Sequence, residues 1–504
     1  MSMSSTTLES EFTLWQSLTQ AHLNPLNNKC MTLPILNLRN QYSRNFHLSW
    51  LGFWVAFLSW FAFSPLIPVA VKKDLNLTAA QIGNSNVVSL CSTLVVRIIV
   101  GPLVDRYGPR KVMAGLLVIG AIPSGLAGTI ATAQGLYIVR FFIGILGGTF
   151  VPCQAWTTAF FDKRVVGRAN ALAGGWGNAG GGFTFIIMVA LYDRLIADRL
   201  ASHVAWRVAF AIVPVPVLLF TAAAVLAFGT DHPNGRWSDR HGPTPSEPDV
   251  TETEQVRTEP HKNAFYLRDN EKKSEGVNVQ VDPAEDGLAS LDTAVNEPLT
   301  WSLSYQLLVS SLTWLPSLAY LTSFGFELAM DANLSNVLYD LYSSRSFGQT
   351  KSGYIASIYG LLNVWTRPFG GYLGDVIYRR FGVPGKKYLM LVLGILQGFM
   401  SIALGLYIDS RERPSLAVVI VVFTILAIVN EAGNGANFSL VPHCNPNSNG
   451  MMSGVVGAMG NLGGVLFALV FRFQPIPYGK AFWIVGIVTV GVNAVLLPVR
   501  VPRW

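Results

Sequence analysis

Apolar stretches of about 20 residues recur along the whole chain and limit its fold more than any other feature. A helix of that length crosses the hydrocarbon core of a bilayer, and only helices and closed barrels satisfy their backbone in lipid. The stretches lack the alternating pattern of barrel strands. Charged residues make up only 13% of the chain, against about 25% in soluble domains. We therefore predict an all-α membrane protein in a lipid bilayer, with about 12 transmembrane helices, near residues 48–71, 80–104, 112–132, 135–160, 169–192, 205–229, 303–330, 351–374, 387–408, 415–441, 451–473 and 479–498.

A polar segment divides this series into six spans before it and six after it. Residues 231–300 contain 15 Asp and Glu against 7 Lys and Arg, are rich in Pro and Gly, and show no apolar periodicity. This composition predicts a largely disordered linker. The predicted organisation is an N-terminal tail, a six-helix half, the linker, a second six-helix half and a C-terminal tail, at residues 1–47, 48–229, 230–300, 301–498 and 499–504.

Clusters of Lys and Arg between the spans predict the orientation of the bundle. The clusters at 106–111, 163–168 and 379–387 fall on one side of the membrane, and cytoplasmic loops carry an excess of these residues. We therefore expect both termini and the linker in the cytoplasm. The tail at 1–47 is polar enough to be solvated, and it lacks the apolar core of a cleavable signal.

Two arginines occupy corresponding places within apolar stretches of the two halves. Arg97 and Arg367 are each followed by Gly after four residues and by Asp after eight, with a constant offset of 270. Arginine within a span costs about 2.5–3.5 kcal/mol and stays protonated. Glu327, Glu431 and Asp331 are the few nearby carboxylates, so a permanent salt bridge is one possibility. Because each half supplies an arginine, we favour an exchangeable oxyanion bound by both guanidinium groups.

A second repeat places an asparagine among glycines in each half. AGGWGNAGGG at 173–182 corresponds to GAMGNLGGV at 457–465, and Asn178 and Asn461 differ by 283. Small residues four apart let helices approach closely, which gives a packing and gating role to Gly177, Gly181, Gly460 and Gly464. The asparagines either donate to a bound anion or bond a neighbouring helix backbone.

Two motifs resemble those of the major facilitator superfamily, a fold with two six-helix halves. GPLVDRYGPRK at 101–111, with its partial copy GGYLGDVIYRRFG, resembles the superfamily's loop motif after the second helix. The resemblance implies a cytoplasmic latch between the halves, formed by Asp105, Arg106, Arg110 and Asp375. Arg140 begins RFFIGILGG, which resembles the fourth-helix motif; we expect its side chain to snorkel to the membrane interface.

The two Gly-Asn motifs together with the two arginines resemble the nitrate/nitrite porter family, and the long linker is similar to that of its fungal members. The resemblance implies alternating access at one anion site and a plasma-membrane location. It adds Phe150, Tyr320 and Phe324 to a substrate site with Arg97 and Arg367, and Asn178 and Asn461 complete the predicted site. The implied cargo is nitrate, and nitrite as a second anion.

Anion uptake into a negative cell interior costs about 2.3 kcal/mol per charge per 100 mV. Eukaryotic members of the family resemble the proton-coupled type, and this resemblance predicts protons as the co-substrate. Glu327, Glu431 and His443 are the candidate proton carriers. A nitrate/nitrite exchanger is the first alternative, and a nitrate sensor that signals through the linker is the second. The chain contains no GxxxxGK[ST] motif and no metal-ligand spacing. We expect no enzyme activity, cofactor, metal, nucleic-acid partner or obligatory protein partner.

Overall fold

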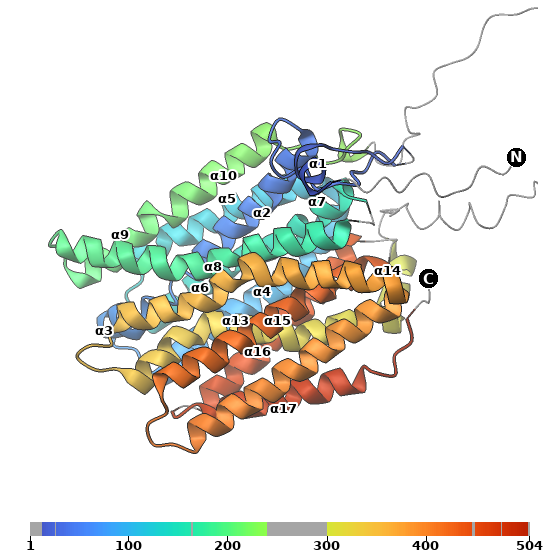
Figure 1. The fold of residues 1–504 in the computed structure, drawn as a ribbon. Helices are drawn as coiled ribbons and strands as arrows, with labels where there is room; N and C mark the ends of the chain where they lie inside the picture. The colour runs from blue at the N-terminus through green and yellow to red at the C-terminus, as the bar shows by residue number, and fades with distance from the viewer. Residues whose placement is uncertain are drawn as a thin grey trace, which may run out of the picture.

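The computed structural model describes residues 13–25, 27–162, 165–238, 300–445, 449–474 and 476–501. Within these ranges the chain is helical, and the only bridges between extended segments are isolated ones. The long helices run roughly side by side as one bundle, and the described ends of the chain lie at the same end of it (Figure 1). We call this the terminal end, and the other the distal end.

The first half contains six rods before the undescribed residues 239–299. A capping box at Thr78 and Gln81 starts the second rod, and Gly108, at φ 87°, ends it; glycine alone adopts such backbone angles without strain. The rods are α2 (Gln41–Trp60, continued by η1, Ile67–Val71, and α3, Lys72–Asp74), α4 (Ala79–Tyr107), α5 (Pro109–Gly125, with η2, Leu126–Thr129), α6 (Ala133–Ile143, continued by η3, Gly144–Thr149, and α7, Phe150–Phe160), α8 (Val166–Ala197), and α9 (Ser202–Ile212) with α10 (Pro214–Phe228).

The second half contains a further six rods. The 61-residue α14 is two helices joined at Gly382, where φ is 62° and the helical backbone is interrupted. A short helix, α12, comes directly before α13, and the two helices are bent by 64° relative to each other. The elements are α12 (Trp301–Val309), α13 (Ser311–Tyr342), α14 (Gln349–Asp409), α15 (Leu416–Cys444), α16 (Asn449–Phe473) and α17 (Gly479–Val495).

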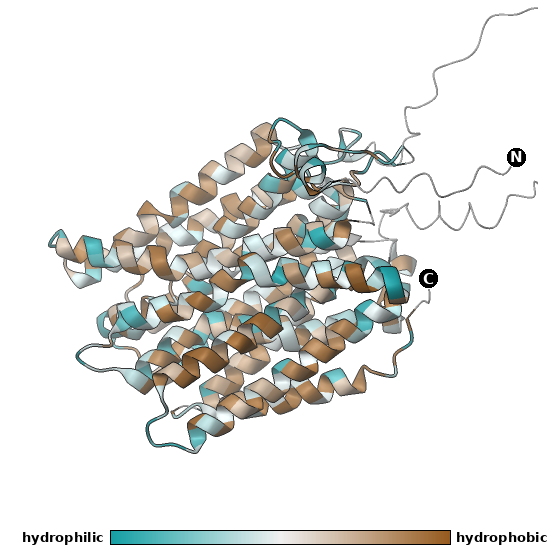
Figure 2. Cartoon of the chain, viewed as in Figure 1, coloured by the Kyte–Doolittle hydropathy of each residue, from teal (hydrophilic) through white to brown (hydrophobic). Residues whose placement is uncertain are grey.

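The predicted membrane character is confirmed. Eight described helices are long and apolar enough to cross a membrane, and nine if α12 and α13 count as one span. Division of α14 at Gly382, together with the shorter α2 and α17, accounts for the predicted twelve among the described residues. Brown, apolar stretches run along the outer helices (Figure 2). Large apolar side chains such as Phe220 and Trp365 are 75% exposed there, as expected for a surface that meets lipid.

Several predicted span boundaries were wrong. The first span was expected to start at residue 48, but α2 begins at Gln41. The seventh span was expected to end at residue 330, but α13 continues to Tyr342. The eighth was expected to end at 374, but its helix continues to Gly382. The end of α13 carries polar residues that other helices cover: Asp331 is buried, and Tyr478 donates to Asp340 at 2.8 Å. Hydropathy alone ends a span at such residues.

The predicted solvated tail also differs from the structure. Residues 20–40 pack on the terminal end of the bundle (Figure 1), where Cys30 donates to the carbonyl of Phe160 at 2.9 Å. The start of the predicted linker packs there too, since Trp237 donates to the carbonyl of Asp105 at 2.8 Å. The rest of the linker, residues 239–299, and the tail residues 1–12 and 502–504 lie outside the described residues.

The two halves meet through two crosswise helix pairs. In one pair α8 packs against the first part of α14, and in the other α4 packs against α16. Each pair contains one arginine-bearing helix from one half and one Gly-Asn helix from the other. The contact between the halves is therefore the place to look for the predicted anion site.

Candidate functional site

Arg97 and Arg367 are both buried within the bundle, at 0% and 1% exposure. Arg97 donates from Nε to the carbonyl of Gly147 at 2.9 Å and from Nη1 to the carbonyl of Gly457, in the other half, at 3.0 Å. Its Nη2 has no hydrogen-bond partner among the described residues. Arg97 therefore keeps a buried charge and one unused donor.

Arg367 has a carboxylate nearby. It donates from Nη2 to the hydroxyl oxygen of Tyr320 at 2.6 Å, and its Nη1 lies 3.6 Å from Oε2 of Glu327. Its Nε has no hydrogen-bond partner among the described residues. The possible salt bridge thus forms for Arg367, whereas no described carboxylate lies within ion-pair distance of Arg97.

Phe150, Tyr320 and Phe324 pack together between the arginines. The rings of Tyr320 and Phe324 stack at 4.7 Å between centroids, and Phe150 stacks on both at 6.2 and 6.1 Å. The guanidinium carbons of Arg97 and Arg367 lie 5.1 and 5.6 Å from the centroid of Phe324. Both cations therefore face one aromatic cluster, which stabilises them through cation–π contacts.

Each Gly-Asn motif faces the arginine of the opposite half. A Cβ at Gly174 of α8 would lie 3.3 Å from Nε of Arg367, and one at Gly457 of α16 would lie 3.1 Å from Cδ of Arg97. Gly174 and Gly457 differ by 283, the offset of the asparagines. We did not predict these two glycines as site residues, although the same repeat contains them.

The four predicted packing glycines have neighbours at different distances. A Cβ at Gly177 would lie 2.0 Å from Phe53, and one at Gly460 would lie 2.7 Å from Tyr320. Added methyl groups at Gly181 and Gly464 would meet neighbours at 3.6 and 3.0 Å. Gly460 thus lies directly against the aromatic cluster, and Gly177 lies against Phe53 of α2.

The two asparagines are buried but differ in their contacts. Neither side-chain atom of Asn178 has a hydrogen-bond partner among the described residues. Asn461 donates to the carbonyl of Gly457 at 2.9 Å within its own helix, and its Oδ1 has no such partner. Asn178 follows Gly174 by one helical turn, so both lie on the same face of α8. Buried polar atoms are usually satisfied, which favours a ligand role for Asn178 over a bond to a neighbouring backbone.

Three carboxylates lie beside Arg367 in the second half. Asn363 of α14 donates to Oε1 of Glu327 at 2.8 Å and to Oε1 of Glu431 at 3.3 Å. Asn434 donates to Oε2 of Glu327 at 2.6 Å, and the hydroxyl of Thr366 donates to Oε2 of Glu431. The third, Asp331, follows Glu327 by one turn of α13. The three acids were predicted from the sequence. Nothing in the sequence indicated that the side-chain amide of Asn363 donates to both Glu327 and Glu431.

The predicted latch aspartates each contact the opposite half at the terminal end. Oδ2 of Asp105 accepts from the backbone N–H of Met451, in the first turns of α16, at 3.2 Å. Oδ2 of Asp375 lies 3.3 Å from Nε of Arg168, near the start of α8, and its Oδ1 accepts from Lys386 at 3.0 Å. Each aspartate therefore joins the two halves at the terminal end.

The two latch arginines are placed differently from the prediction. Arg110 pairs with Asp231, at 3.2 Å between Nε and Oδ2, within its own half. Burial raises the pKa of Asp231, while Arg110 acts in the opposite direction. Arg106 is exposed and lies over the ring of Tyr107. Among the described contacts, neither arginine joins the halves.

Arg140 does not snorkel to the interface. It is 2% exposed and donates to Oγ of Ser85 at 2.7 Å and to Oδ1 of Asn86 at 2.6 Å. Its helix continues through η3 into α7, so Arg140 faces α4 rather than water. The sequence prediction was wrong here because α4 supplies polar partners within the bundle.

The distal end is closed as well. Oε1 of Gln349 in the second half accepts from the backbone N–H groups of Val69 and Ala70 at 2.8 and 3.0 Å. Asn86 donates to the carbonyl of Ala332 across the same boundary at 3.1 Å. With contacts between the halves at both ends, the arginines lie in an occluded site.

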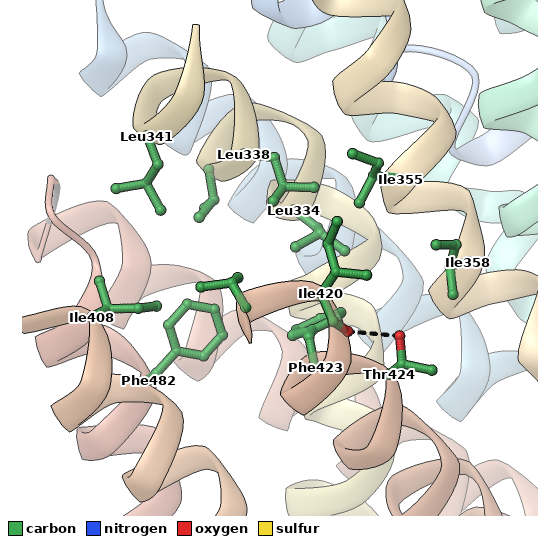
Figure 3. Close-up of a pocket in the computed structure, with 12 residues that line it drawn as sticks. Leu334, Leu338, Leu341, Ile355, Ile358, Ile408, Ile420, Phe423, Thr424 and Phe482 are labelled. Carbon is green, nitrogen blue, oxygen red and sulfur yellow. Dashed lines mark hydrogen bonds between the residues drawn. The ribbon is translucent and has the colours of Figure 1, made fainter. Parts of the chain in front are cut away.

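One pocket lies elsewhere, within the second half. Apolar side chains of α13, α14, α15 and α17 line it, including Leu334, Ile355 and Phe423 (Figure 3). Thr424 is its one hydroxyl-bearing residue and donates to the carbonyl of Ile420 at 2.7 Å. The twelve lining residues include no charged group, so this pocket suits apolar chains rather than an anion. The described residues contain no group of His, Cys, Asp and Glu that would hold a metal.

Comparisons with known proteins agree with this architecture. The model of the Major Facilitator Superfamily matches residues 49–468. High affinity nitrate transporter 2.5 of Arabidopsis thaliana is 30% identical over 479 residues, which are 95% of this chain and 83% of that protein. Elsinochrome transporter 1 of Elsinoe fawcettii is 28% identical over 93% of this chain and 95% of its own length. Other relatives of plants, algae and cyanobacteria are named as nitrate transporters.

A solved structure has a similar fold. It is a bacterial homolog of the human lysosomal transporter Spinster, in an inward-facing and unoccupied conformation. Its TM-score is 0.54, at 14% sequence identity, and the match covers 91% of this chain and 95% of that one. At this identity the match shows the fold alone.

Proposed function

The chain belongs to the Major Facilitator Superfamily, and we propose that it imports nitrate, and nitrite as a second anion, across the plasma membrane. Its family and relatives are transporters rather than enzymes. The observation that carries the proposal is the occluded pair Arg97 and Arg367, one from each half, with unused N–H donors around one aromatic cluster.

The chemistry of this pair favours a small planar oxyanion. A guanidinium group donates two parallel hydrogen bonds to such an anion, and the aromatic rings pack between the two guanidinium groups. The unpartnered amide of Asn178 adds a donor. The relatives named for nitrate transport support the same cargo, while the relative named for elsinochrome makes the choice of cargo a matter for direct measurement.

We infer that transport follows alternating access, with the occluded state described here as an intermediate. Opening toward the cytoplasm requires loss of the Asp105 and Asp375 contacts, and opening outward requires loss of the Gln349 contacts. The glycine faces of α8 and α16 allow the helices of opposite halves to slide at close range. Nitrate in the site would offset the repulsion between two buried cations.

Proton symport is the proposed driving mechanism. Nitrate entry against a negative interior costs about 2.3 kcal/mol per 100 mV, and two protons per nitrate would reverse the sign of the transported charge. His443 lies at the terminal end, 3.1 Å from Nζ of Lys386, whereas Glu327 and Glu431 lie beside Arg367. Of the three candidate carriers, the two glutamates are therefore better placed to couple to the anion.

Nitrate uptake and membrane current, measured in cells that lack their own nitrate transporter, test the proposal. We expect saturable uptake with an inward positive current that grows as the external pH falls. Uptake without net current would favour nitrate/nitrite exchange, and absence of nitrate uptake would reject the function. Nitrate uptake measured with added elsinochrome tests whether this chain also binds the cargo for which the fungal relative is named.

The nitrate-sensor alternative is tested with a deletion. Removal of residues 243–295 spares Trp237 and the other packed residues before 239. We expect this variant to keep nitrate uptake. Loss of a nitrate response in cells with uptake intact would instead favour the sensor.

A further inference from the structure

Helices α13 and α15 of the second half carry three buried carboxylates, and one of them lies in ion-pair contact with Arg367. Glu327, Glu431 and Asp331 are 1%, 0% and 5% exposed, and all lie on helices α13 and α15 of the second half. Arg97 has no carboxylate within ion-pair distance among the described residues, whereas Arg367 has Glu327. The two arginines correspond in sequence, but their surroundings differ in charge.

The surroundings of Glu327 join the anion site to a second acid. Glu327 contacts Arg367 through Oε2 and Asn363 through Oε1. The same amide nitrogen of Asn363 also donates to Glu431. No described cation lies within ion-pair distance of Glu431, whose other contact is the hydroxyl of Thr366. A chain of direct contacts therefore leads from Arg367 through Glu327 and Asn363 to Glu431.

The charge balance of this region depends on proton occupancy. Arg97 and Arg367 bring two positive charges, whereas the three carboxylates would bring three negative charges if all were ionised. A nitrate ion adds one more negative charge. An uncompensated charge buried in the bundle is strongly destabilising, and carboxylic acids, unlike arginine, can become neutral by binding a proton. Nitrate therefore enters this region most favourably together with protons on the carboxylates.

On the basis of the proposed nitrate–proton symport, we propose that Glu327 and Glu431 carry the coupled protons, and that Glu327 competes with nitrate for Arg367. A proton from the outside binds Oε2 of Glu327, and the ion pair with Arg367 is lost. Nη1 of Arg367, released from Glu327, then donates to nitrate. Asn363 links Glu327 to Glu431, which binds the second proton.

Release on the inner side reverses these steps. Nitrate leaves, the protons of Glu327 and Glu431 depart to the cytoplasm, and Arg367 returns to the carboxylate of Glu327. The empty protein then returns with the ion pair between Arg367 and Glu327 restored. Its charge and its number of bound protons are the same as at the start of the cycle. Because ion and proton binding favour each other, each raises the affinity for the other by the same factor.

Several other titratable or charged groups surround this pair. Arg367, and Tyr359 on the same helix, face it from α14, and Arg97 faces the site from α4. Tyr320 and Asp331 lie within about two turns of Glu327 on α13. Tyr359 donates to Oδ1 of Asn430, the residue directly before Glu431. Arginines stay protonated and tyrosines titrate only at high pH, so Asp331 is the acid to separate from the pair by substitution.

The test uses purified full-length protein in proteoliposomes. Glu327→Gln and Glu431→Gln keep the size of the side chain and remove its titration. We expect both variants to lose at least about tenfold more of the nitrate accumulation driven by a pH gradient than of the nitrate-for-nitrate exchange. Asp331→Asn tests the third acid, and Glu412→Gln, in the exposed loop after α14, is a control expected to match the wild type in both assays.

Proton uptake on nitrate binding is the second measurement, and it needs no variant. Calorimetric titration of the wild type with nitrate in two buffers of different ionisation enthalpy gives the protons bound per nitrate. We expect about one or more for the wild type and a smaller number for Glu327→Gln.

The outcomes separate this inference from the proposed function. A wild type without nitrate transport rejects the proposed function. A wild type that accumulates nitrate with a pH gradient, together with two glutamine variants that do the same, rejects the glutamates as carriers. Zero proton uptake on nitrate binding also rejects them. Loss of coupling in Asp331→Asn alone would move the role to Asp331 and overturn the inference.

Discussion

A single methyl group at Gly460 is expected to disturb the anion site without touching a charge. A Cβ there would lie 2.7 Å from Cδ1 of Tyr320 and 2.8 Å from Cδ1 of Phe324, although carbon atoms in contact prefer about 3.5–4.0 Å. The two rings stack on each other at 4.7 Å, and Phe438 packs against Tyr320 at 5.0 Å. The rings can therefore yield only by moving together.

The displacement would reach the anion site through Tyr320, because its hydroxyl oxygen accepts from Arg367 at 2.6 Å. Overpacking of this kind costs about 1–3 kcal/mol. If the empty protein relieves that strain by shifting the rings, nitrate binding must restore them. At about 1.4 kcal/mol per factor of ten, Gly460→Ala should weaken nitrate binding by about 5- to 100-fold.

The assay is nitrate affinity by calorimetry, together with the Km of uptake and the amount of protein at the cell surface. Gly491→Ala is the matched control, because α17 offers no atom within 4 Å of an added Cβ at that exposed position. An affinity of Gly460→Ala within about twofold of the control would refute the argument, since it would mean that the packed rings do not hold the site in shape.

The other substitutions test the ligands and the latch. Arg97→Lys and Arg367→Lys keep the charge but lose the planar fork, so each should weaken nitrate uptake at least about tenfold; a wild-type Km in either would reject the ligand role. Asn178→Ala removes a buried amide without protein partners, so nitrate affinity should fall while the melting temperature of the empty protein stays or rises; a lowered melting temperature with unchanged affinity would indicate a structural role. Arg168→Gln removes the ion pair with Asp375, which is partly exposed and contributes about 1 kcal/mol or less, and it leaves the bond from Lys386 to Asp375 in place; hydrogen exchange in the first turn of α8 should become several-fold faster, and unchanged exchange would show that the pair does not hold the terminal end.

The parts of the site that repeat in the sequence were predictable. A cation in an apolar stretch needs a partner or a wet cavity, and a second copy at a constant offset indicates a shared site between halves. The structure places Arg97, Arg367 and the three aromatic residues together. The ligand and gating roles of these residues stay predictions, because they concern a bound anion and a moving protein.

What the sequence left open depends on helix rotation and depth. Glu327 was one of several acids near the spans, and only the packing of α13 on α14 brings its carboxylate to Arg367. Arg140 was expected to snorkel to the membrane interface, but Ser85 and Asn86 of α4 accept from it within the bundle. Contacts between helices distant in sequence decide both cases, and local patterns carry no information about them.

The crosswise arrangement of the two repeats gives a physical reason for coupling anion binding to closure. Gly174 of the first half lies against Arg367 of the second, and Gly457 of the second lies against Arg97 of the first. Each arginine is therefore enclosed by the half to which it does not belong. When the halves separate, each guanidinium loses that cover and gains water, which lowers the cost of its charge. When they close without an anion, two cations are buried with only Glu327 in ion-pair contact with either. An anion that enters together with protons on the glutamates keeps the buried cations compensated, and so the same contacts that exclude water also make closure depend on what is bound.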